Sequence, residues 1–186
     1  AVTAIAQTYK DDPDTLRLLK DRVQNDDDED VRYAAVEAIA QTYKDDPNTL
    51  RLIKDRVQND DDGNVRSVAV EAIAQTYKDD PDTLRLLKDR VQNDDDGYVR
   101  RVAVKAIAQG WKDNPEVIQL LLQVAMQDPF EREDSWQDNP RQAALEALLR
   151  QAPTDPNIME LLRDRAEHDG DEQLRDWAKE RLSRAT

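Results

Sequence analysis

Apolar residues return at helical spacing along the whole chain, in two alternating patterns. In the first pattern Leu16, Leu19 and Val23 stand three and four residues apart, as they would on one face of a helix. The second pattern, over residues 31–39, is rich in small residues, and an acidic turn at residues 25–28 separates the two. No strand-like alternation is present in the sequence. The pattern predicts an all-α protein built from helix pairs.

The pair of patterns recurs with a period of 34 residues. The segment Val36–Ala69 returns almost unchanged as Val70–Ala103, with four differences: Asn48/Asp82, Ile53/Leu87, Asn64/Tyr98 and Ser67/Arg101. A fixed period of this length is typical of stacked supersecondary units, each of which contacts its neighbours, rather than of one globular core. We therefore expect an α-solenoid of stacked antiparallel helix pairs.

An Asp or Asn followed by Pro opens the first helix of every repeat, which suits an N-cap followed by the first helical position. These dipeptides are Asp12-Pro13, Asp46-Pro47, Asp80-Pro81, Asn114-Pro115 and Asp155-Pro156. We expect a partial helix at residues 1–9, followed by helices at 13–24, 29–43, 47–58, 63–77, 81–92, 97–111, 115–127, 138–151, 156–168 and 171–183. As one array, residues 1–186 divide into a partial helix at 1–11, repeats at 12–45, 46–79, 80–113 and 114–154, and a C-terminal cap at 155–186.

One repeat breaks the period. Val104 corresponds to Leu145, a spacing of 41 residues instead of 34, which places seven extra residues near 128–138. This insertion carries two large apolar residues, Phe130 and Trp136, among acidic ones. We expect both to pack back onto the array, because exposing them together invites association. The alternative is that they project as an anchor for a partner.

Composition narrows the classes of function. The net charge of −14 argues against binding of nucleic acid or of an anionic membrane surface, since both require a basic surface. The chain has no cysteine, no apolar run of membrane-spanning length and no visible signal peptide. We expect a cytoplasmic protein. Residues 1–6 match the middle of a repeat helix, which predicts a further domain upstream and an N-terminal face able to self-associate.

The acidic turn and the second helix together carry a recurring motif. Its first copy reads Asp26-x4-Val31-Arg32-x2-Ala35 and resembles the HEAT-repeat family, in which a turn Asp precedes a Val-Arg pair. Pro140 and Leu174 replace the valine in the last two copies. From the constant spacing we expect a structural ladder in which the turn acids meet arginines of the same or an adjacent repeat. Its members are Asp26, Arg32, Asp60, Arg66, Asp94 and Arg100.

A second resemblance is narrower. The text from Ala106 to Pro115, AIAQGWKDNP, is similar to repeats found downstream of NACHT-type nucleotidase modules of the STAND class in bacteria, especially cyanobacteria. That resemblance implies the C-terminal sensor region of a larger cytoplasmic protein. Two alternatives stay open. One is a HEAT-like bilin lyase or chaperone-like protein acting on phycobiliproteins. The other is an engineered or recently duplicated array without an evolved ligand.

We expect neither catalysis nor a cofactor or metal. The acidic turns lack the ordered ligand alternation and the bidentate Glu of a calcium loop. His168 is the only histidine, with no second His or Cys to complete a site, and it stands at a predicted helix end where a cation favours the helix dipole.

Differences among the first three repeats gather on the second helix, while Arg17, Lys20, Asp21 and Gln24 of the first helix are retained as a solvated outer face. Positions 30, 33 and 37 are three and four residues apart and share one helix face. In a HEAT-like stack this face lines the concave side. We expect a protein or peptide ligand there, contacting a groove of Tyr33, Glu37, Tyr98, Arg101, Lys105 and Gln142.

Overall fold

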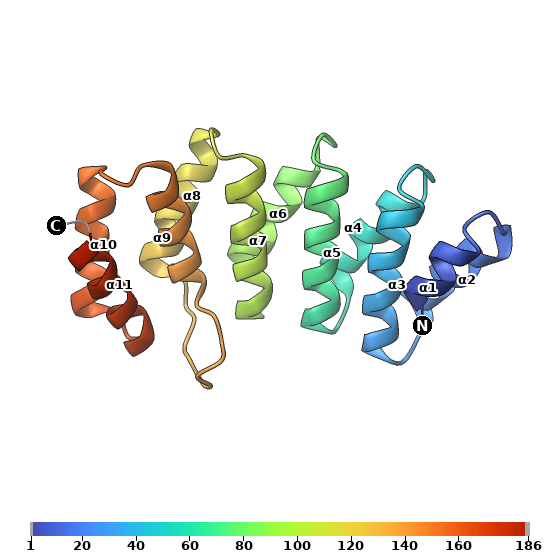
Figure 1. The fold of residues 1–186 in the computed structure, drawn as a ribbon, viewed down its shortest axis with the longest axis horizontal. Coiled ribbons are helices and arrows are strands. Elements are labelled where there is room, and N and C mark those ends of the chain that lie inside the picture. Colours follow the sequence, from blue (N-terminus) through green and yellow to red (C-terminus); the bar gives the residue numbers. More distant parts are fainter. Residues whose placement is uncertain (1, 185–186) are drawn as a thin grey trace. The chain divides into compact units, whose positions relative to one another are not determined.

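The computed structural model describes residues 2–184, and within them the chain forms eleven α-helices and no strand (Figure 1). The helices are α1 (Val2–Thr8), α2 (Pro13–Asn25), α3 (Glu29–Thr42), α4 (Thr49–Asn59), α5 (Gly63–Thr76), α6 (Thr83–Asn93), α7 (Gly97–Gly110), α8 (Pro115–Gln127), α9 (Pro140–Gln151), α10 (Pro156–His168) and α11 (Glu172–Arg184). The all-α solenoid of helix pairs is confirmed. Residue 1 of the expected partial helix and residues 185–186 of the expected cap lie outside the described range.

The chain divides into two compact units, Ala1–Ala106 and Ile107–Thr186. We call them the N-terminal unit and the C-terminal unit. The boundary falls within α7, so most of that helix belongs to the first unit. Each unit has its own core and is described by itself.

The N-terminal unit is built in two layers of helices. The helices α3 and α5 pack side by side in one layer, and α2, α4 and α6 form the other (Figure 1). Within a repeat the two layers meet as pairs, α2 with α3 and α4 with α5. The apolar positions that defined the helical pattern fill the space between the layers, where Leu19, Val23, Ile39, Ile53 and Ile73 are almost completely buried.

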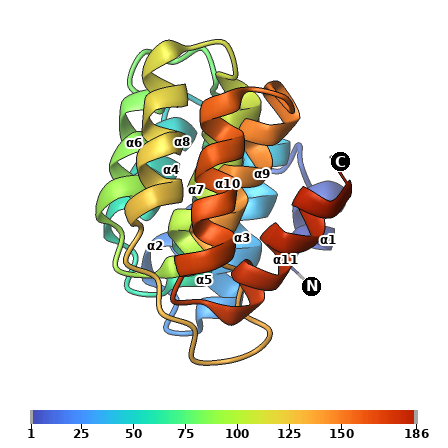
Figure 2. The ribbon, with the colours of Figure 1, turned by 90° about the vertical axis from the view of Figure 1, so that its left-hand side faces the viewer.

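The C-terminal unit contains the pairs α8–α9 and α10–α11, with further contacts between α9 and α10. Its core holds Leu121, Leu145, Leu148, Leu162 and Leu174, all nearly inaccessible to solvent. The insertion leaves the end of α8 and returns to α9 as an extended loop, visible beyond the helix ends in two views (Figures 1 and 2).

The Asp-Pro and Asn-Pro signals mark helix starts in two ways. Asp12, Asn114 and Asp155 each accept a hydrogen bond from the backbone N–H two residues later, and the helix begins at the intervening proline. The expected starts of α4 and α6 at proline are wrong, because these helices begin at Thr49 and Thr83. The aspartates before those prolines, Asp46 and Asp80, still accept the backbone N–H two residues later. The proline, however, lies in a turn that precedes the helix.

Candidate functional site

Arg66 joins the turn of its own repeat to the turn of the next. Its Nε and Nη2 atoms donate to the two carboxylate oxygens of Asp94 at 3.1 and 2.9 Å. Its Nη1 atom donates to the backbone carbonyl oxygens of Asp60 and Asp61 at 3.0 and 3.1 Å. The planar guanidinium suits this double role, since one edge matches a carboxylate while the other binds carbonyl groups.

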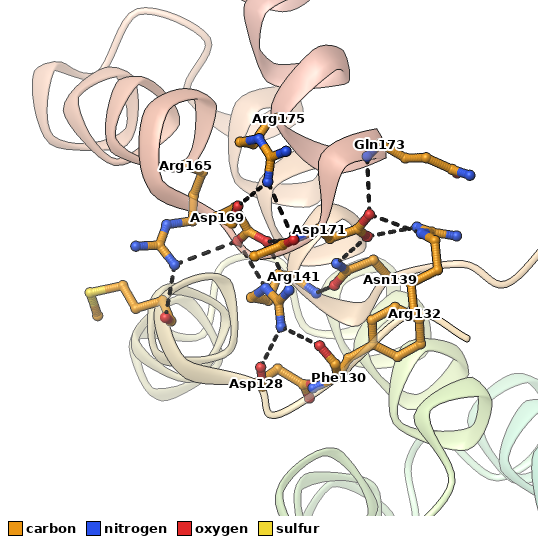
Figure 3. Close-up of polar contacts among 12 residues, drawn as sticks. Asp128, Phe130, Arg132, Asn139, Arg141, Arg165, Asp169, Asp171, Gln173 and Arg175 are labelled. Atoms are coloured by element: carbon orange, nitrogen blue, oxygen red, sulfur yellow. Dashed lines mark hydrogen bonds and ion pairs between the residues drawn. The ribbon is translucent and has the colours of Figure 1, made fainter. Parts of the chain in front are cut away.

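The same arrangement appears at two other steps. Arg32 binds the carboxylate of Asp60 at 3.2 and 3.0 Å. Arg141 binds that of Asp169 at 2.9 and 2.8 Å, in the C-terminal unit (Figure 3). In each pair the arginine precedes the acid by 28 residues. The carboxylate partner is therefore in the adjacent repeat, and the bond within a repeat goes from arginine to carbonyl oxygen.

Each buried acid of this arginine ladder also receives a second arginine, which the sequence reasoning missed. Arg56 donates to Asp60 and Arg90 donates to Asp94, both at 3.2 Å and both from the helix that leads into the turn. The carboxylates further accept backbone N–H groups of their own turns. The signal in the sequence was an arginine four residues before each of these acids.

The remaining expected members of the ladder, Asp26 and Arg100, make hydrogen bonds within the turns of their own repeats. Asp26 accepts from Arg22 at 2.9 Å and from the backbone N–H of Asp28, and the Arg22 guanidinium lowers the pKa of Asp26. Arg100 donates to the carbonyl oxygens of Asp94 and Asp95 at 2.9 and 3.1 Å. These bonds fix the conformation of the two turns.

A second set of residues lies on one face of α3, α5 and α7 in the N-terminal unit. We call this set the second-helix face; it consists of the predicted Tyr33, Glu37, Tyr98, Arg101 and Lys105, together with Glu71, which the prediction did not include. Partial burial raises the pKa of Tyr33, and the charges of Glu37, Glu71 and ionised Tyr98 raise it further. Tyr33 lies on α3, Glu71 on α5 and Tyr98 on α7, so three successive second helices contribute to this face.

The basic end of the second-helix face is formed by a stacked pair. The guanidinium carbon of Arg101 lies 4.7 Å from the centre of the Tyr98 ring, within the range of a cation–π contact. Tyr98 remains 43% exposed and Tyr33 37% exposed, and Lys105 is exposed as well. Gln142 belongs to the C-terminal unit, where its amide donates to Glu146 at 3.0 Å. Its place in a common groove stays a prediction.

The insertion folds back, but through polar contacts. Phe130 is half-buried, with the Arg132 guanidinium 5.6 Å from its ring centre. The expectation that Trp136 packs onto the array is wrong, because this side chain is 76% exposed. The reason is that a turn closed by the bond from Gln137 N–H to the Asp134 carbonyl oxygen carries Trp136 away from the helices.

Arg132 fastens the insertion to the turn between α10 and α11 (Figure 3). Its Nε and Nη2 atoms donate to Asp171 at 2.9 and 2.7 Å, and Asn139 donates to the same carboxylate at 2.8 Å. Burial alone would raise the pKa of Asp171, but the bonds from Arg132 and Asn139 outweigh it and lower that pKa to about 2. Sequence reasoning missed this cluster, because Asp171 looked like one more acid of an acidic turn.

The comparison with protein families agrees with this geometry. A family model described as HEAT repeats matches residues 1–74, 16–108, 49–149 and 84–183 in overlapping segments. The chain belongs to the HEAT-repeat family. No curated protein and no solved structure matches it. HEAT repeats are protein-interaction scaffolds, and such stacks present long surfaces to partners.

On the outer face of the first helices of this HEAT array, two lysines are less exposed to solvent than expected. Lys20 donates to Asp46 at 2.8 Å and Lys54 donates to Asp80 at 2.6 Å, in each case across to the next repeat. All four side chains are half-buried. Lys20 therefore makes a contact between repeats and is not simply solvated. This contact gives a structural reason why the lysine is kept in the first three repeats.

Among residues 2–184 no group of three or more acidic or histidine side chains is placed to hold a metal ion. His168 lies at the end of α10, with its Nδ1 atom 3.2 Å from Asp164. Over the same residues, every helix is too short or too polar to cross a bilayer.

Proposed function

We propose that this HEAT array is a non-catalytic recognition scaffold that binds a protein or peptide segment along its second-helix face. The observation that carries the proposal is the stacked pair of Tyr98 and Arg101, which stays accessible on a face shared with Tyr33. Tyr and Arg are enriched among residues that dominate binding energy. Stacking also holds the arginine in place before a ligand arrives, which reduces the ordering cost of binding.

The charges along the face indicate the chemistry of the ligand. Glu37 and Glu71 make the part around Tyr33 acidic, whereas Arg101 and Lys105 make the part around Tyr98 basic. A segment with a basic end and an acidic end satisfies both parts. Such complementarity fixes the direction in which the segment lies, and it speeds association at low salt.

The finer role rests on resemblance. The text AIAQGWKDNP supports placing the array in the C-terminal sensor region of a larger cytoplasmic bacterial protein with a nucleotidase module upstream. In that setting ligand binding along the second helices would be transmitted to the upstream module. A bilin lyase on phycobiliproteins and an array without an evolved ligand are the alternatives. The complete open reading frame separates them, since a phosphate-binding loop upstream supports the sensor.

The binding test compares two double variants, each of which removes one arginine and one large side chain with apolar surface. Tyr98→Ala with Arg101→Ala alters the second-helix face, and Leu18→Ala with Arg17→Ala alters an exposed apolar residue and an exposed arginine of α2. Partners are captured from a cell extract of the source organism, and affinity is measured by calorimetry. The first variant should lose at least ~2 kcal/mol of binding free energy and the control almost none. Equal binding by both would refute the proposal.

A further inference from the structure

The loop that carries Trp136 is held firmly on both sides of that residue. Gln137 accepts the backbone N–H groups of Glu133 and Asp134 with its side-chain oxygen, at 2.8 and 3.0 Å. Gln173 of α11 donates to the carbonyl oxygen of Ser135 at 3.2 Å. The bidentate contact from Arg132 to buried Asp171 fastens the base of the loop. These contacts hold the backbone on both sides of Trp136, whose side chain is exposed.

An acidic hollow lies beside this loop. It measures about 530 Å³, and the insertion and the turn between α10 and α11 form its walls. Glu131, Glu133, Asp134 and Glu172 contribute carboxylates to it. The arginines that line it, Arg132 and Arg141, already bind carboxylates and carbonyl oxygens. The insertion as a whole, residues 128–138, carries five acidic residues and one arginine. The hollow therefore offers negative charge to an incoming basic side chain.

We propose that the insertion is a second docking site, distinct from the second-helix face, for a basic protein segment in which an arginine or lysine adjoins an apolar residue. The basic side chain enters the acidic hollow, and the apolar residue packs on the ring of Trp136. A cation near the ring face gains a further cation–π contribution. Because the loop is already ordered, little conformational entropy is lost on binding.

The same charges argue against two other occupants. An anionic membrane surface is repelled by the carboxylates around Trp136, although tryptophan alone favours such interfaces. A second copy of the chain brings a net charge of −14 to an acidic site, which opposes association. The basic segment is the occupant that the electrostatics favour.

The test uses the full chain as bait for a display library of random dodecapeptides, and affinities of the enriched peptides are measured by fluorescence anisotropy. We expect enrichment of sequences with arginine or lysine next to an aliphatic residue. Trp136→Ala should weaken them at least about tenfold. Met126→Ala, which removes another exposed apolar side chain of the same unit, should leave affinity unchanged. Both variants should keep the wild-type urea midpoint, because both side chains are exposed.

Further variants separate this site from alternatives. Glu133→Gln with Asp134→Asn should weaken the same peptides and reduce their salt dependence, whereas Tyr98→Ala with Arg101→Ala should not affect them. The proposal is overturned if no peptide is enriched, if the peptides lack basic residues, or if they bind Trp136→Ala equally well. Trp136-dependent flotation with phosphatidylserine vesicles, or Trp136-dependent dimerisation in sedimentation, would also overturn it.

Discussion

The arginine ladder predicts that a single interior arginine contributes strongly to stability, and Arg66→Met is the clearest test. Methionine retains an apolar stem of similar length and removes the guanidinium. Asp94, whose side chain is fully buried, then loses its bidentate partner and keeps Arg90 at 3.2 Å and one backbone N–H. Two carbonyl oxygens of the preceding turn lose their donor as well.

The magnitude follows from these contacts. Removing one partner of a buried ion pair costs about 3–5 kcal/mol, because the other charge stays buried without compensation. The two bonds that Asp94 retains reduce the expected loss to about 3 kcal/mol. The contact of Arg66 with Asp95 adds little, since the Asp95 side chain is 91% exposed.

Urea unfolding measures this loss, followed by circular dichroism and by tryptophan fluorescence. With a slope of about 2–3 kcal/mol per molar urea, the midpoint should fall by about 1 M. Unfolding of repeat arrays can lose cooperativity, so hydrogen exchange of α5 and α6 provides an independent local measurement. Arg66→Lys should also be destabilised, because an ammonium group cannot reproduce the bidentate geometry.

The matched control is Arg85→Met. Arg85 pairs with Asp82 at 3.3 Å, but its side chain is 77% exposed, so its loss should cost under about 0.5 kcal/mol. If Arg66→Met unfolds at the same urea concentration as Arg85→Met, the ladder does not stabilise the stack and the reasoning above is wrong.

Two further predictions concern the insertion. Because the folded pKa of Asp171 is about 2 against an ordinary value of 3.8, its carboxylate stabilises the fold above about pH 4 and loses that effect as the pH falls toward 2. Between pH 5 and 2.5 the urea midpoint of the wild type should therefore fall more than that of Asp171→Asn, and parallel curves would contradict this. With Trp111 and Trp177 replaced by Phe, acrylamide should quench the fluorescence of Trp136 readily, whereas strong protection would show that this residue is buried.

The helices were predictable because their apolar positions follow one period through the whole chain, but the starting points of α4 and α6 were not. Asp80-Pro81-Asp82-Thr83 has the same sequence as Asp12-Pro13-Asp14-Thr15, yet the first segment begins its helix at threonine and the second at proline. Lys54 of the preceding repeat donates to both Asp80 and Asp82, at 2.6 and 3.4 Å. Such long-range contacts involve groups that the local sequence does not show.

The conformation of the insertion also depends on long-range contacts that the local sequence does not show. Its length and its two aromatic residues were visible in the sequence, and burial of both was the expectation for large apolar groups. Trp136 lies instead in the turn closed by Gln137 N–H and the Asp134 carbonyl oxygen, and the base of that loop is held by Arg132 and Asp171, which are 39 residues apart. Tyr98 and Arg101 were found because they differ between otherwise identical repeats. Their stacking could be read only from the structure.

The constant step of 28 residues between each ladder arginine and its acid has a consequence for how this chain can change in length. The step from Arg141 to Asp169 is unaltered by the insertion, which lengthens only the stretch between Asp128 and Arg141, from 6 residues to 13. Extra residues in that turn therefore leave the 28-residue spacing between arginine and acid unchanged. Excision of residues 36–69 would likewise leave Asp94 28 residues after Arg32. Whole repeats and edge loops are thus separate modules, which evolution or a protein engineer can exchange independently.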